Sequence, residues 1–115
     1  MGTAKKSPAP SDKVELYDRL VATIPEVSRK GATVPYTSVN GNMFSYLDKS
    51  GSMALRLPRQ AREAFIEDYG TSLFDSYGIV QKEYVRVPDA LLATTEDLQP
   101  YFAASHEYAN PDNSR

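Results

Sequence analysis

The sequence contains no cysteine, so disulfide bonds, zinc–thiolate sites and thiol catalysis are all excluded. Long apolar runs are missing as well, and no segment approaches the roughly 18 to 20 apolar residues that a membrane-spanning helix needs. The opening residues MGTAKKSPAP lack the apolar stretch of a signal peptide. We therefore expect a cytoplasmic protein with no membrane partner.

An excess of positive charge is also missing, because Lys and Arg number 13 and Asp and Glu number 15, for a formal net charge of −2. Proteins that hold nucleic acid through phosphate attraction are usually basic, although a local basic patch is still compatible with this composition. A hydrophobic content of 41% and a charged content of 24% are ordinary for a globular domain. The 115 residues fit one domain.

Residues 1–10 and 110–115 are small, polar and interrupted by proline, which predicts a disordered tail at each end of a single domain over residues 11–109. Apolar residues at helical spacing predict a helix from Ser11 or Asp12 to Pro25, a second from Pro58 to Gly70, and a last one capped by Thr94 or Thr95. Strands are predicted at 33–39, 42–47, 53–57 and 79–87, a loop or short irregular strand at 71–78, and a helical turn at 88–93. The order α-β-β-β-α-β(β)-α predicts a two-layer α+β fold, with an antiparallel sheet and helices on one face.

The dipeptide Asn40-Gly41 is the strongest turn signal in the chain, because both positions of a tight hairpin turn need a positive φ. A two-residue turn there pairs Ser38 with Met43, and regular alternation then pairs Tyr36 with Ser45 and Val34 with Leu47. A loop at 48–52 pairs Leu47 with Met53 and Ser45 with Leu55. Paired residues share a face, so the predicted core face comprises Val34, Tyr36, Met43, Leu47, Met53, Leu55 and Leu57.

The opposite, open face is predicted to collect Pro35, Thr37, Phe44, Tyr46, Ala54 and Arg56 from the first three strands. Val85 and Val87 suit the core, which turns Lys82, Tyr84 and Arg86 of the later strand outward onto this same face. A slip of one residue in register would exchange the two faces.

Aromatic and basic side chains alternate on this open face, and three interpretations stay open. Tyr, Phe and Arg are common anchors of protein interfaces. Aromatic rings between basic residues also stack on nucleobases and contact phosphates. The third interpretation is a solvated face that carries aromatics because strands favour them. The candidate partner-binding residues are Phe44, Tyr46, Arg56, Lys82, Tyr84 and Arg86.

Catalytic and metal-binding patterns are not found. His106 is the single histidine, with no metal ligand three or four residues away, and we expect it to face solvent on the last helix. The chain has no nucleophile elbow, no phosphate-binding glycine loop and no calcium loop. The carboxylates lie on a charged helix or in a first helical turn, where structural reasons account for them. We therefore expect no catalytic, metal or cofactor site, and no enzyme.

Three segments of the chain resemble the TfoX N-terminal domain family. They are Asn40-Gly41-Asn42-Met43-Phe44, then Met53-Ala54-Leu55-Arg56-Leu57-Pro58, and then Tyr84-Val85-Arg86-Val87-Pro88 with Leu91 and Leu92. The resemblance covers residues 12 to 109 and implies a two-layer α+β fold. The family takes its name from a bacterial regulator of competence for DNA uptake, which carries a second, C-terminal domain. We expect this chain to be a stand-alone member without that domain.

Two hypotheses for the function follow from these observations. The first is a non-enzymatic bacterial interaction or regulatory domain whose open sheet face binds a protein partner or a second copy of the chain. The second is a nucleic-acid-binding regulator that uses the same face, with Arg56, Lys82 and Arg86 on phosphates.

Overall fold

The computed structural model describes residues 10–31, 33–76 and 78–110, and the predicted tails fall outside this part except for Pro10 and Asn110. Within it, five strands form one antiparallel sheet in the order β1-β2-β3-β5-β4. The strands are β1 (Tyr36–Val39), β2 (Asn42–Leu47), β3 (Met53–Arg56), β4 (Leu73–Ser76) and β5 (Ile79–Val87). The helices are α1 (Ser11–Val21), α2 (Arg59–Tyr69), α3 (Asp89–Leu92) and α4 (Thr95–Ala109).

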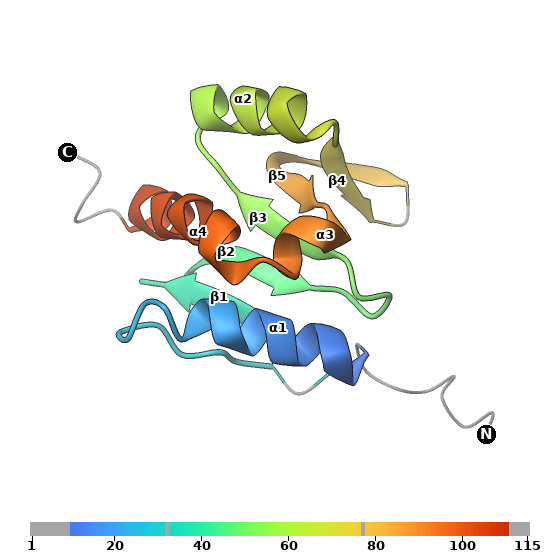
Figure 1. Ribbon diagram of the computed structural model, residues 1–115. Helices are drawn as coiled ribbons and strands as arrows, with labels where there is room; N and C mark the ends of the chain where they lie inside the picture. The colour runs from blue at the N-terminus through green and yellow to red at the C-terminus, as the bar shows by residue number, and fades with distance from the viewer. Residues whose placement is uncertain (1–9, 32, 77, 111–115) are drawn as a thin grey trace, which may run out of the picture.

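The helices form a second layer on one face of the sheet (Figure 1). Helices α1, α3 and α4 cross in front of the central strands, while α2 lies beside β5 at the upper edge. The predicted α+β fold is therefore confirmed. The segment 71–78, predicted as a loop or short irregular strand, contains the edge strand β4 at residues 73–76. Several bounds differ from the prediction. Helix α1 has Pro10 rather than Ser11 or Asp12 in the capping position and ends at Val21 rather than at Pro25, and β1 begins at Tyr36 rather than at residue 33.

The turns follow the sequence closely. Asn40 and Gly41 have φ values of 52° and 82°, which is the left-handed pair that a tight hairpin turn requires. Gly70 ends α2 in the left-handed conformation, with φ of 61°. Pro58 precedes the first turn of α2, where a missing N–H does least harm.

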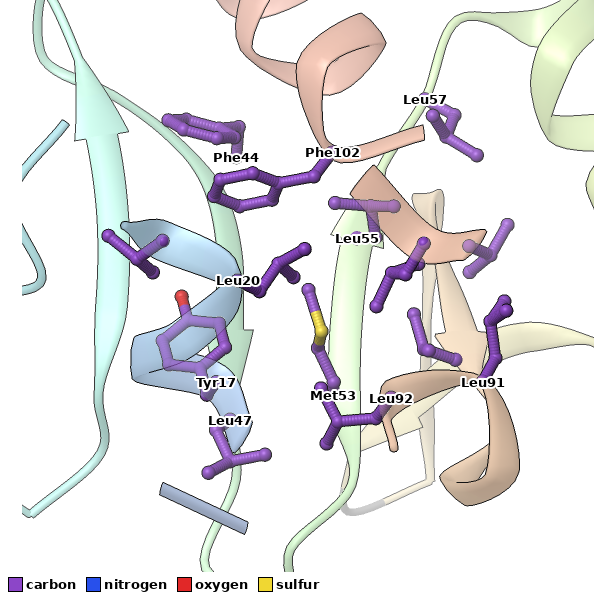
Figure 2. Packing of buried hydrophobic residues seen from close by; sticks show 14 of the residues in the cluster. Tyr17, Leu20, Phe44, Leu47, Met53, Leu55, Leu57, Leu91, Leu92 and Phe102 are labelled. Atoms are coloured by element: carbon purple, nitrogen blue, oxygen red, sulfur yellow. The ribbon is translucent and has the colours of Figure 1, made fainter. Parts of the chain in front are cut away.

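One hydrophobic core lies between the sheet and the helices (Figure 2). Each helix contributes to it, for example through Tyr17 of α1, Phe65 of α2, Leu91 of α3 and Phe102 of α4. Four residues of the predicted core face, Leu47, Met53, Leu55 and Leu57, are fully buried there. The pairs Leu47 with Met53 and Ser45 with Leu55 form as predicted.

A β-bulge in the first hairpin corrects the rest of the predicted register. Ser38 pairs with Met43 as expected, but Thr37 pairs with Ser45, so Phe44 is an extra residue in β2. The extra residue exchanges the faces of the hairpin beyond the bulge. Tyr36 consequently pairs with Tyr46 instead of Ser45.

The exchange moves several side chains away from their predicted faces. Thr37 and Phe44, predicted on the open face, are fully buried, and Figure 2 shows the Phe44 ring facing Phe102 in the core. Pro35, also predicted to be open, is buried. Val34, Tyr36 and Met43, predicted in the core, are absent from its buried cluster and instead line a groove on the opposite face.

Candidate functional site

The sheet face opposite the helices, called the second face below, contains an open groove of about 460 Å³. Among the described residues, those that line it are Val34, Tyr36, Met43, Tyr46 and Gln81. The groove therefore lies between the β1–β2 hairpin and the strand β5. Four of the five lining side chains are apolar or aromatic, and the bulge places three of them, Val34, Tyr36 and Met43, on this face.

The polar groups at the floor of the groove are bonded to each other. Tyr46 donates its hydroxyl hydrogen to Oε1 of Gln81 over 2.8 Å. Burial, with help from the neighbouring Tyr84 and Asp48, raises the pKa of Tyr46 to about 12, above the range in which a free tyrosine ionises. This bond fixes the ring that separates the groove from the rest of the second face.

Beside the groove, a small aromatic layer covers the central strands. The rings of Tyr46 and Phe74 meet edge to face with centroids 5.4 Å apart, and Tyr84 lies 5.8 Å from Tyr46. Phe74 is fully buried although it belongs to no helix-side cluster, and Ala54 below the layer is fully buried too. The predicted open face is therefore packed in its centre and accessible at the groove.

The bulged segment of β2 also binds Tyr84 through a backbone carbonyl group. The hydroxyl of Tyr84 donates to the carbonyl oxygen of Met43 over 2.8 Å. On the other side of the same strand, Ser105 of α4 donates to the carbonyl of Phe44 over 3.2 Å. Burial raises the pKa of Tyr84. These bonds hold the bulged segment from both faces and so fix the groove wall at Met43.

The arginines of the candidate set are paired with carboxylates. Nε of Arg56 lies 2.6 Å from Oε1 of Glu83, and its guanidinium lies 5.2 Å from the ring centre of Tyr108 on α4. Arg86 covers the ring of Phe74 at 4.4 Å and lies 3.3 Å from Oδ1 of Asp75. These pairs neutralise the charges of both arginines.

The structure places only some of the six candidate partner-binding residues on the second face. Register places Tyr46, Tyr84 and Arg86 on the second face, and Arg56 belongs to it by pairing although its guanidinium reaches Tyr108. Lys82 is exposed and lies in a stretch where the β4–β5 register shifts, so simple alternation does not fix its face. Phe44 is in the core and is no surface residue.

His106 also differs from the prediction. Only 9% of its surface is exposed, and its ring meets that of Phe44 edge to face with centroids 5.5 Å apart. It is therefore a core residue of α4 and does not face solvent. Its burial could have been predicted from its position one helical turn after Phe102, since Phe102 and Ala109 already mark that side of the helix as apolar.

Among residues 10–31, 33–76 and 78–110, no three His, Asp or Glu side chains gather as ligands of a metal ion. In the same part of the chain, no helix has the length and apolar character needed to cross a membrane.

No family model matches the sequence, and no curated protein matches it either. The resemblance to the TfoX N-terminal domain family therefore stays a prediction.

Proposed function

We propose that this chain is a non-enzymatic interaction domain with a regulatory role, and that it binds a protein surface through the groove on its second face. The open apolar groove lined by Tyr36, Met43 and Tyr46 carries the proposal. Interface hot spots are typically aromatic or apolar anchors that fill pockets of the partner. A groove whose described lining is apolar or aromatic apart from Gln81 suits such an anchor.

The openness of the groove favours a protein partner over a small ligand. Small molecules usually lie in concave sites that bury most of their surface. This groove lies on a sheet face, is lined from β1, β2 and β5, and is open to solvent. A side chain presented by another protein needs only such a recess, because the surrounding surface contributes the remaining contacts.

Exposed apolar residues around the groove support the same conclusion. Met43 is 37% exposed at its wall, and Ile79, which shares β5 with Gln81, is 69% exposed. Contiguous exposed apolar surface commonly marks a protein interaction site.

The nucleic-acid hypothesis has less support. Phosphate contacts depend on cations that are available to replace counterions. Arg56 and Arg86 already face Glu83 and Asp75, and the rings of Tyr46 and Tyr84 pack within the aromatic layer. Lys30 beside β1 and Lys82 on β5 are separated by β2 and β3, so they form no continuous basic stripe.

The resemblance to a family of bacterial regulators supports a regulatory role and a cytoplasmic location. The proposed function requires no catalytic residue, because the groove and the residues around it only bind the partner.

The test uses peptides because the partner is unidentified. A random peptide library is selected on the wild-type chain alone, and the selected peptides are then titrated against Met43→Lys, which places a charge at the groove wall. We expect peptides with aromatic or large apolar residues whose binding shifts the amide resonances of residues 34–36, 43–46 and 81. Binding should be at least about tenfold weaker for Met43→Lys.

The control is Tyr69→Lys, because Tyr69 is also 37% exposed but lies on α2. It should bind the selected peptides as the wild type does. Peptides that bind Met43→Lys equally well, or that shift other resonances only, would reject the proposed function. A DNA duplex at low salt serves as the second probe, and salt-sensitive shifts at Lys82 and Arg86 would replace the proposal with the nucleic-acid alternative.

A further inference from the structure

The second face carries an exposed apolar side chain close to the groove. Gln81 lines the groove, and Ile79 lies two residues before it on β5. Residues two apart on a strand point to the same side, at a separation of roughly 7 Å. Ile79 therefore stands beside the groove on the same face, with 69% of its surface exposed.

A recess and a projecting apolar side chain on one face form a self-complementary surface. In a dimer with two-fold symmetry the same patch meets itself, so the projection of each copy reaches the recess of the other. The axis then passes between Ile79 and the groove, and a short distance between them makes both contacts possible in one small interface. The large apolar side chain of Ile79 matches the lining of Val34, Tyr36 and Met43.

The charged side chains of the second face allow two copies of this face to meet. Near a two-fold axis, like charges meet like charges, which costs free energy unless each is neutralised within its own chain. The pairs Arg86–Asp75 and Arg56–Glu83 provide this neutralisation. Two further cations, Lys30 beside Tyr36 and Lys82 on β5, are exposed and have stems long enough to turn their ammonium groups into solvent.

We infer that the groove takes a second copy of this chain, in a two-fold dimer where Ile79 of each copy occupies the groove of the other. The inference rests on the proposed function and names its partner. A five-stranded sheet face measures roughly 24 Å by 17 Å, so two copies bury on the order of 800 Å². Interfaces below about 1,200 Å² belong to weak complexes. The dimer is therefore weak, with a dissociation constant on the order of micromolar or above.

The test is a complementation experiment followed by sedimentation across a concentration series. Ile79→Asp removes the projection and Met43→Lys blocks the groove. Each variant alone should dimerise at least about tenfold more weakly than the wild type. In an equimolar mixture, one copy keeps its groove and the other keeps its Ile79, while the second contact becomes an Asp–Lys pair. The mixture should therefore form a heterodimer.

The matched control is Val80→Asp. Val80 is also apolar and 52% exposed, and it follows Ile79 on β5, so it points to the opposite side of the strand. It should dimerise as the wild type does. Two results would overturn the inference: a wild-type chain that stays monomeric at millimolar concentration, or equal weakening by Val80→Asp.

A mixture of Ile79→Asp and Met43→Lys that stays monomeric would also overturn it. These failures differ from failure of the proposed function. A monomeric wild type that still binds peptides in a Met43-dependent way would reject the second copy as partner and leave the interaction site in place.

Discussion

The hydroxyl of Tyr17 on α1 lies 2.6 Å from Oγ of Ser45 on β2, inside the hydrophobic core. Ser45 in turn lies 2.5 Å from Oγ1 of Thr37 on β1, and all three residues are fully buried. Buried hydroxyls cost free energy unless they are hydrogen-bonded, and here each has a partner. The bulge at Phe44 makes this network possible, because it brings Thr37 and Ser45 opposite each other on the helix side.

Replacing Tyr17 by Phe removes one hydroxyl and keeps the ring, so the effect reports the hydrogen bond. Ser45 and Thr37 can still bond to each other, and we expect the free energy of unfolding to fall by about 1 to 2 kcal/mol. Urea denaturation of both proteins measures the loss. The control is Tyr108→Phe, since the Tyr108 hydroxyl makes no hydrogen bond with the described residues, and its effect should stay within about 0.5 kcal/mol. Equal losses in the two variants would contradict the role of the network.

Stability should fall at alkaline pH because burial raises the pKa of several phenols, among them those of Tyr17 and Tyr46. Burial raises the pKa of Tyr17 strongly and that of Tyr46 to about 12, whereas an unfolded chain holds tyrosine at about 10. The native state therefore keeps protons that the unfolded state releases. The contribution to stability is complete below pH about 10 and is lost as the pH rises above it through the folded-state values.

Urea midpoints at increasing pH measure this dependence. The double variant Tyr17→Phe, Tyr46→Phe should show a smaller decrease above pH about 10 than the wild type. An identical decrease in both proteins would assign the alkaline effect to other groups.

The bulge predicts opposite behaviour for two neighbouring side chains. Phe44 is fully buried against Phe102, whereas Met43 is 37% exposed at the groove. Phe44→Ala should lower the free energy of unfolding by about 3 to 5 kcal/mol, and Met43→Ala should cost under about 1 kcal/mol. Urea denaturation measures both. The regular register without a bulge predicts the reverse order, so the ranking decides between the two arrangements.

Most helices, strands and turns could be predicted from the sequence because their causes are local. The turn at Asn40-Gly41 depends only on the backbone preferences of those two residues. Helix α2 begins after Pro58 and ends at Gly70, and each of these residues favours a helix end at its own position. The β2–β3 pairing was also predictable, since the short loop 48–52 and the apolar positions Leu47 and Met53 agree.

The groove could not be predicted, because it depends on one extra residue in β2. Alternation from the turn assigns Tyr36 and Met43 to the core, and the only contrary signs are the adjacent apolar pairs Met43-Phe44 and Tyr46-Leu47. The register is decided by tertiary contacts, because Phe44 packs on Phe102 and Ser45 forms a hydrogen bond with Tyr17. Phe74 was missed for a similar reason, because its burial depends on Tyr46 and Arg86 from other strands.

Replacing Gly31, which precedes the groove residues Val34 and Tyr36, should lower the free energy of unfolding more than replacing Gly41, which has a similar backbone conformation. Gly31 has φ of 85° and Gly41 has φ of 82°. A Cβ at Gly41 would meet no atom, whereas a Cβ at Gly31 would collide with the carbonyl oxygen of Val34 and lie 3.0 Å from Cδ1 of Tyr36. Both substitutions carry the left-handed penalty of about 1 to 2 kcal/mol, but only Gly31→Ala adds a steric cost of about 1 to 3 kcal/mol.

Thermal or urea unfolding of Gly31→Ala and Gly41→Ala measures this difference. Because Val34 and Tyr36 line the groove, Gly31→Ala should also shift the amide resonance of Gln81 across it, while Gly41→Ala should change only the turn and its neighbours. Peptides selected on the groove should then bind Gly31→Ala more weakly than Gly41→Ala. Equal stability and equal peptide binding for the two variants would show that the backbone at Val34 moves aside without cost, and that the groove wall is not held by the close approach of Gly31.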